Sequence, residues 1–167
     1  AKNMLATYSI ASTYGINHET IVKEFESFDF LEGRGKQIHK NGYLIVDDTY
    51  NANFESFKMG ISAFMNIECK GNKILVIGDM KELGDKNYEY HYQLGKYINN
   101  EKPEVVFSLG NSIKTTIKQI NNNYTLSRHF NESQNLVEEL KNIIIKNDMI
   151  YLKASRTMKF ENIINKI

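Results

Sequence analysis

Short apolar runs alternate along the chain with longer stretches in which apolar residues recur every three or four positions. The continuous runs predict strands at 43–46, 73–77, 105–109 and 149–153, with a shorter strand at 128–130. The spaced stretches predict helices over 54–67, 88–98, 113–120 and 132–145. Strands that are apolar throughout are buried on both faces, and helices between them are typical of parallel sheets. The pattern therefore predicts a Rossmann-like α/β fold, with a doubly wound, mainly parallel sheet and helices on both faces.

The amino-terminal part of the chain has a different pattern. One helix is predicted over 4–14, and a second begins after Asn17, which can cap it. Neither helix is next to a strand that it could cover. The composition changes at the glycine-containing segment 31–35, where we expect a hinge. We therefore predict a helical tail of a preceding domain at 1–31 and an α/β domain at 32–167, in a chain that starts inside a longer protein.

Charge and composition exclude several classes of protein. Lys and Arg number 21 against 20 for Asp and Glu, so the net charge of +1 gives no bulk attraction to nucleic acid. No run approaches the roughly 20 apolar residues that cross a bilayer, so membrane insertion is not expected. The single Cys69 has no second cysteine for a disulfide or a zinc cluster, which favours a reducing, cytoplasmic location.

Polar residues gather directly after the predicted strands, where open parallel sheets bind their ligands. The polar segments are 47–53, 78–80, 110–112 and 153–156. In the first of them, the carboxylates of Asp47 and Asp48 can accept ribose hydroxyls or hold Mg²⁺ through water, and Asn51 can orient a substrate. The competing interpretation is that these residues cap the helix that starts near Asn53. For the segment as a whole, we favour a functional role.

A second group of interest follows the last predicted strand. Lys153, Ser155 and Arg156 combine two cations with a hydroxyl, which suits a carboxylate or a phosphate. An ordinary basic surface turn would look the same. The chain has only three arginines against eighteen lysines, so Arg34, between two glycines, and Arg156 are unusual choices.

Several common active sites are not recognisable in the sequence. There is no Gly-x-x-x-x-Gly-Lys-[Ser/Thr] phosphate loop and no glycine-rich dinucleotide fingerprint after a strand. The four histidines are scattered without a metal-binding spacing, and Cys69 has no evident base. These features disfavour a metal hydrolase, a thiol enzyme and a Rossmann-type oxidoreductase. The alternative to an enzyme domain is a stand-alone α/β module that binds a nucleotide or a small peptide without catalysis.

Read together, the polar segments resemble the motifs of one family. Residues 47–53 are similar to Asp-Asp-Ser-Tyr-Asn-Ala-Asn-Pro, with Thr49 and Phe54 as departures, and residues 78–84 to Gly-Asp-Met-x-Glu-Leu-Gly. His91-x-x-Leu-Gly follows, Gly33-Arg34 matches the entry to the domain, and 153–158 resembles Lys-Gly-Ser-Arg-x-Met with alanine at 154. The chain thus resembles the carboxyl-terminal domain of the Mur ligases, most closely the members that add D-alanyl-D-alanine.

This resemblance implies the last piece of a three-domain enzyme. Its relatives use ATP and Mg²⁺ to convert the carboxylate of UDP-N-acetylmuramoyl-tripeptide into an acyl phosphate, which the amine of D-alanyl-D-alanine attacks. The phosphate loop would lie in the central ATPase domain, and residues 1–31 would be the tail of that domain. The central domain would also hold most of the Mg²⁺ contacts. The implied partners are the two substrates and the remainder of the same polypeptide. We expect no catalytic or metal-ligating residue within this chain, and no turnover by the chain alone.

The resemblance also implies roles for individual residues. Nucleotide contacts are implied for Arg34, Asp47, Asp48, Asn51 and Asn53. Substrate contacts are implied for Lys81, Glu82, Lys153, Ser155 and Arg156. Lys153, Ser155 and Arg156 would receive the dipeptide, whose free carboxylate needs a cation, whereas the roles of Lys81 and Glu82 in the neighbouring loop stay open.

Overall fold

The computed structural model describes residues 2–28 and 31–167, and the chain divides into two compact units, 1–30 and 31–167. The first unit contains the helices α1 (Lys2–Thr13) and α2 (His18–Glu26), close to the two predicted helices. As predicted, Asn17 caps α2, because its side chain accepts a hydrogen bond from the backbone N–H of Thr20 at 2.8 Å.

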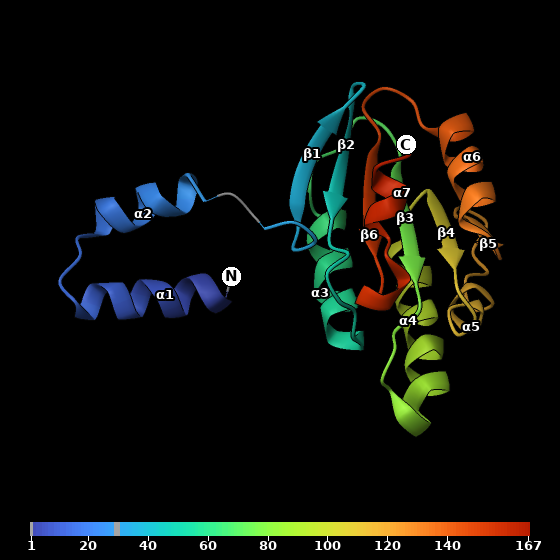
Figure 1. The fold of residues 1–167 in the computed structure, drawn as a ribbon, viewed down its shortest axis with the longest axis horizontal. Helices are drawn as coiled ribbons and strands as arrows, with labels where there is room; N and C mark the ends of the chain where they lie inside the picture. The colour runs from blue at the N-terminus through green and yellow to red at the C-terminus, as the bar shows by residue number, and fades with distance from the viewer. Residues whose placement is uncertain (1, 29–30) are drawn as a thin grey trace. The chain divides into compact units, whose positions relative to one another are not determined.

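The second unit is built on a six-stranded sheet with the order β1-β2-β6-β3-β4-β5 (Figure 1). The strands are β1 (Lys36–Lys40), β2 (Tyr43–Asp47), β3 (Lys73–Gly78), β4 (Val105–Leu109), β5 (Leu126–Phe130) and β6 (Met149–Lys153). All neighbouring pairs are parallel except β1 and β2, which are antiparallel. The predicted α/β fold with a mainly parallel sheet is therefore confirmed.

Helices cover both faces of the sheet. One face packs against α3 (Phe54–Met65), α4 (Asn87–Glu101) and α5 (Lys114–Ile117), and the other against α6 (Ser133–Ile143) and α7 (Glu161–Ile164). The central strand β3 shows why the strand sequences are apolar throughout: both of its faces are buried. Its residues Ile74 and Val76 join the core with α6 and α7, whereas Leu75 and Ile77 join the core with α3 and α4.

The position of β6 between β2 and β3 fixes where the strand ends meet. The chain passes from β2 to β5 through α3, α4 and α5 on one face, then returns through α6 on the other face to insert β6. The loops after β2, β6 and β3 are joined by backbone hydrogen bonds, from Asp48 N to Leu152 O and from Ser155 N to Asp79 O, both 3.0 Å. Because the chain reverses its order here, this edge is where a ligand is expected to bind.

Two details differ from the sequence-based expectations. Strand β1 was not predicted, because Lys36–Lys40 has a single aliphatic residue and lies at the sheet edge. The helix expected over 113–120 is a single α-helical turn, after which Gln119 and Ile120 form tighter i to i−3 hydrogen bonds. The hinge expected at 31–35 stays a prediction, and within it Gly35 N donates a hydrogen bond to Asp47 O at 2.7 Å.

The β1–β2 hairpin depends on a two-residue turn, Asn41-Gly42, in which both residues have positive φ (49° and 85°). Replacing Gly42 with alanine forces a side chain into this conformation, so Gly42→Ala should lower the free energy of unfolding by about 1 kcal/mol. Urea unfolding of the 167-residue chain measures this loss. Gln37→Ala, on the exposed side of β1, is the control and should change the free energy by less than about 0.5 kcal/mol. Equal stabilities for the two variants would contradict the turn assignment.

Candidate functional site

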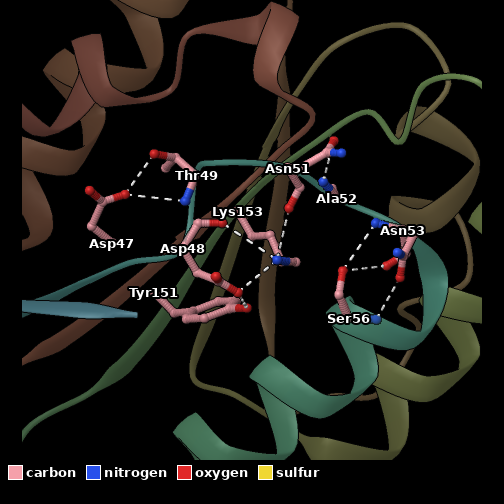
Figure 2. Close-up of polar contacts among 9 residues, drawn as sticks. All are labelled: Asp47, Asp48, Thr49, Asn51, Ala52, Asn53, Ser56, Tyr151 and Lys153. Carbon is pink, nitrogen blue, oxygen red and sulfur yellow. Dashed lines mark hydrogen bonds and ion pairs between the residues drawn. The ribbon is translucent and has the colours of Figure 1, made fainter. Parts of the chain in front are cut away.

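The loops after β2, β6 and β3 form the end of the sheet that we call the strand-end edge. An ion pair between residues of β6 and the loop after β2 lies at its centre (Figure 2). Lys153 ends β6 and Asp48 directly follows β2, and Lys153 Nζ lies 2.7 Å from Asp48 Oδ2. The same ammonium group donates to the carbonyl of Asn51 at 3.0 Å. Lys153 is buried, whereas the Asp48 side chain is 23% exposed. The lysine is therefore a fixed internal cation that holds the Asp48 carboxylate and the following loop.

A second donor reaches the same carboxylate oxygen. The hydroxyl of Tyr151 donates to Asp48 Oδ2 at 2.6 Å, and burial together with the Asp48 charge raises the pKa of Tyr151 well above 10. Within the described residues, Asp48 Oδ1 receives no hydrogen bond. Asp48 lines an open pocket of about 330 Å³ with Arg34, Tyr50 and Asn51 among its other walls. The free oxygen is thus available to a donor in this pocket.

Asp47 points away from this pocket, toward Thr49 (Figure 2). Its carboxylate accepts hydrogen bonds from Gly33 N at 2.9 Å and from Thr49 N and Oγ1 at 3.1 and 2.6 Å. Successive residues of an extended chain face opposite sides, which separates Asp47 from Asp48. Asp47 therefore braces the loop that carries Arg34, and its oxygens are engaged by the chain itself.

The loop at Gly33 holds Arg34 at the pocket. Gly33 has a φ of +73°, its carbonyl accepts from Tyr50 N at 2.9 Å, and a Cβ there would lie 2.8 Å from that nitrogen. Only glycine allows this approach. The guanidinium carbon of Arg34 lies 3.9 Å from the centre of the Tyr50 ring, a cation–π contact.

The two asparagines of the motif organise the start of α3. Asn53 is its N-cap and forms a capping box, accepting from Ser56 N at 2.8 Å and donating its own N–H to Ser56 Oγ at 3.0 Å. Asn51 accepts a hydrogen bond from the next backbone N–H at 2.8 Å. Phe54 stands where the resemblance has proline, and it stacks on Tyr90 with ring centres 5.3 Å apart. The capping interpretation thus holds for Asn53, and the box and the stack fix the helix start without the proline.

A second polar cluster follows β3. The buried carboxylate of Asp79 accepts hydrogen bonds from Lys81 Nζ at 2.8 Å, Ile113 N at 2.9 Å and Asn111 N at 3.2 Å. Burial raises the pKa of this carboxyl, but the hydrogen bonds from Lys81, Ile113 and Asn111 and the charge of Lys81 together outweigh burial, so the pKa falls below its usual value. Asp79 is therefore charged and holds Lys81, whose side chain is 46% exposed.

His91, in α4, holds the loop between Asp79 and η1 (Gly84–Lys86). Its Nε2 accepts a hydrogen bond from Met80 N at 3.1 Å, and its Nδ1 lies 2.7 Å from the carbonyl of Asn87. A carbonyl can only accept, so Nδ1 carries the proton and the ring is neutral. Burial lowers the pKa of His91. Glu82, in the same loop, is exposed and has a φ of 62°.

The structure separates the three residues that were expected to form one group after β6. Lys153 is committed to Asp48, whereas the Ser155 hydroxyl accepts a hydrogen bond from Lys81 N at 2.8 Å. Arg156 is exposed and forms an ion pair with Glu161 at 3.2 Å. The two cations and the hydroxyl therefore have different partners, and their joint role in substrate binding stays a prediction. Ala154 is buried without crowding, because Gly78 opposite it has no side chain.

The described residues form neither a metal-binding cluster nor a membrane-spanning helix. They contain no group of three or more His, Cys, Asp or Glu residues that could hold a metal ion. No helix in the described part of the chain has the length and apolar character needed to cross a bilayer.

Comparison with known proteins identifies the family. The family model for the glutamate ligase domain of Mur ligases matches residues 33–156, which include both polar clusters. The chain belongs to the Mur ligase family. The resemblance in its motifs is thereby confirmed.

This Mur ligase domain is similar over almost its whole length to two curated ligases and to one solved structure. UDP-N-acetylmuramoyl-tripeptide--D-alanyl-D-alanine ligases of Bacillus subtilis and Buchnera aphidicola are 32% and 35% identical over 97% and 99% of the chain. The solved structure of MurF ligase from Thermotoga maritima in complex with ADP is 28% identical over 98% of the chain, with a TM-score of 0.83. The chain spans 35–36% of the length of these three relatives.

Tyr151 is the site residue that sequence reasoning missed in this Mur ligase domain. It lies in a strand that is otherwise aliphatic up to Lys153, and a buried tyrosine hydroxyl almost always has a partner. That polar group within an apolar run was the available signal. It could not identify Asp48 as the partner, because the pairing of β2 with β6 is not encoded in the periodicity.

The neutral state of His91 makes the stability of the domain dependent on pH. The folded pKa lies below the ordinary 6.5, so the unfolded chain binds a proton more readily and stability is lost as the pH falls below about 6.5. Urea unfolding between pH 8 and pH 5 should show a smaller decline in stability for His91→Gln than for the original chain. His39→Gln, on the exposed side of β1, should keep the decline of the original chain. A decline that is equally steep in the His91 variant would refute this role.

Proposed function

We propose that this chain is the carboxyl-terminal domain of an ATP-dependent ligase that joins D-alanyl-D-alanine to UDP-N-acetylmuramoyl-tripeptide. The observation that carries the proposal is the strand-end site within the matched segment 33–156, where Asp48 presents one free carboxylate oxygen to an open pocket. Relatives with this activity in their names align over nearly the whole chain. The chain supplies a preformed ligand face, and the remainder of the polypeptide supplies the other wall of the active site.

The pocket at Asp48 is proposed to receive the nucleotide. A carboxylate oxygen without a donor suits a ribose hydroxyl, and Arg34 beside it adds a cation fixed by its stack on Tyr50. The similarity to a MurF ligase in complex with ADP supports a nucleotide ligand. Asn51 lines the same pocket, and Asn53 shapes its edge by starting α3. Asp47 acts indirectly, through the loop of Arg34.

The dipeptide is proposed to bind beside the second cluster. Lys81 lines an open pocket of about 470 Å³ whose other walls include Asn111, Asn131 and Ser133. Its exposed ammonium group can receive the dipeptide carboxylate, while the buried Asp79 keeps it in place. Ser155 positions this loop through the backbone of Lys81. Glu82 and Arg156 are proposed to border the substrate, whereas Lys153 acts by holding Asp48.

The rest of the reaction is proposed to take place on residues outside this chain. Following the resemblance to Mur ligases, we assign Mg²⁺ and the phosphate loop to a central ATPase domain. Residues 1–31 are proposed to be the tail of that domain. Large apolar side chains of this tail are exposed, including Leu5 at 67% and Ile10 at 60%, and they would pack against the remainder of the polypeptide. The free Cys69 agrees with a cytoplasmic enzyme.

The whole protein encoded with this chain tests the proposal in a ligation assay. Phosphate release from ATP should require both UDP-N-acetylmuramoyl-tripeptide and D-alanyl-D-alanine. Asp48→Ala should raise the KM for ATP about tenfold by removing a charged hydrogen-bond acceptor, while the KM for the dipeptide stays the same. Lys81→Ala should raise the KM for the dipeptide and leave the KM for ATP unchanged. Gln37→Ala, outside both pockets, is the control.

Two results would contradict the proposal. Phosphate release that does not depend on the dipeptide would rule out the ligase activity. Tight nucleotide binding by the 167-residue chain, with no ligation by the whole protein, would favour the stand-alone binding module.

A further inference from the structure

Tyr151 occupies an unusual place for a residue with a polar tip. It is 2% exposed, and its ring lies in the core between the sheet and α3, with its centre 5.5 Å from that of Phe64. Its hydroxyl nevertheless reaches the strand-end edge and donates to Asp48 Oδ2 at 2.6 Å (Figure 2). The ring belongs to the core and the hydroxyl belongs to the site.

Gly60 explains how the hydroxyl reaches Asp48. This glycine lies inside α3, where glycine costs about 1 kcal/mol relative to alanine. A Cβ at residue 60 would overlap the Tyr151 hydroxyl oxygen, and it would lie 2.9 Å from Tyr151 Cζ and 3.2 Å from Asp48 Oδ2. The helix therefore has a notch where the phenol passes. The glycine inside the helix and the buried tyrosine hydroxyl, each unfavourable without the other, account for each other.

The contact determines how the Asp48 carboxylate is oriented. The terminal torsion of an aspartate is broad, so a single donor leaves the carboxylate free to rotate. Here Tyr151 and Lys153 both donate to Oδ2, from 2.6 and 2.7 Å. Two donors on one oxygen hold the group so that Oδ1 is the oxygen left for a ligand.

We propose that Tyr151 is a positioning residue for nucleotide binding, and that Gly60 is the notch in α3 that makes this position possible. This inference rests on the proposed nucleotide role of Asp48. Tyr151 does not touch the nucleotide, and it acts by orienting the carboxylate that does. Because its pKa is raised well above 10, the phenol keeps its proton and donates throughout the physiological pH range.

A hydroxyl deletion in the whole ligase tests the inference. Tyr151→Phe preserves the ring in the core and removes one donor from Asp48. The KM for ATP should rise about three- to tenfold, while kcat changes by less than about twofold, because ribose contacts are the same in the ground state and the transition state. A merely structural role would lower the amount of active enzyme, and hence the apparent kcat, with no change in KM.

Tyr97→Phe is the matched control. The Tyr97 hydroxyl also donates to α3, to the carbonyl of Lys58 at 3.3 Å, but it does not touch Asp48. Removal of this hydroxyl should leave the KM for ATP and the KM for the dipeptide unchanged.

Gly60→Ala extends the test to the notch. The added methyl group should displace the phenol and raise the KM for ATP at least as much as Tyr151→Phe does. In the double variant the overlapping oxygen is absent, so adding Gly60→Ala to Tyr151→Phe should have a smaller effect than Gly60→Ala alone. If Gly60→Ala does not fold, the comparison of Tyr151→Phe with Tyr97→Phe still decides.

The outcomes separate the inference from the proposed function. If Asp48→Ala raises the KM for ATP and Tyr151→Phe does not, the positioning role is overturned and the nucleotide site stands. If Asp48→Ala also leaves the KM unchanged, the nucleotide site itself is overturned, and the positioning role with it.

Discussion

The buried ammonium group of Lys153 is the constraint on which the ligand face depends. A cation without a partner in this environment would cost several kcal/mol, so Lys153 must keep the Asp48 carboxylate and the Asn51 carbonyl within reach. The insertion of β6 between β2 and β3 makes this contact possible. The ion pair holds together two strand ends that are about a hundred residues apart in the sequence, and it fixes the loop that begins α3.

The same edge is made rigid by contacts that run between loops. Asp79 gathers Lys81 and two backbone N–H groups from the loop after β4, and His91 supports Met80 from α4. Ser155 connects the loop after β6 to Lys81. Two ligand pockets are thus formed on one preorganised edge, and few side chains need to reorient when a substrate arrives. This arrangement suits the role proposed for the domain, as one preformed wall of an active site.

Local chemistry could be predicted from the sequence, and pairing between distant segments could not. Strands such as 149–153 were recognisable because both of their faces are buried, and Asn17 and Asn53 because caps are local. The position of β6 between β2 and β3 depends on tertiary packing and cannot be derived from hydrophobic periodicity. The partner of Lys153 was therefore not predicted. Alternation along the chain separates Asp47 from Asp48. The residues after β6 have different partners because Ser155 bonds to the loop after β3 and Arg156 begins a 3-10 turn. For the edge strand β1, the only indication in the sequence was the Asn41-Gly42 turn that follows it.

The coupling free energy between Asp48 and Lys153 tests this account most directly. Asp48→Asn, Lys153→Met and the double variant of the 167-residue chain would be unfolded in urea at neutral pH. Each single variant leaves a buried or half-buried charge without its partner, so we expect the double variant to be no less stable than Lys153→Met or Asp48→Asn alone, with a coupling of about 2 kcal/mol. Losses that simply add, with a coupling below about 0.5 kcal/mol, would contradict the claim that this pair holds the site together.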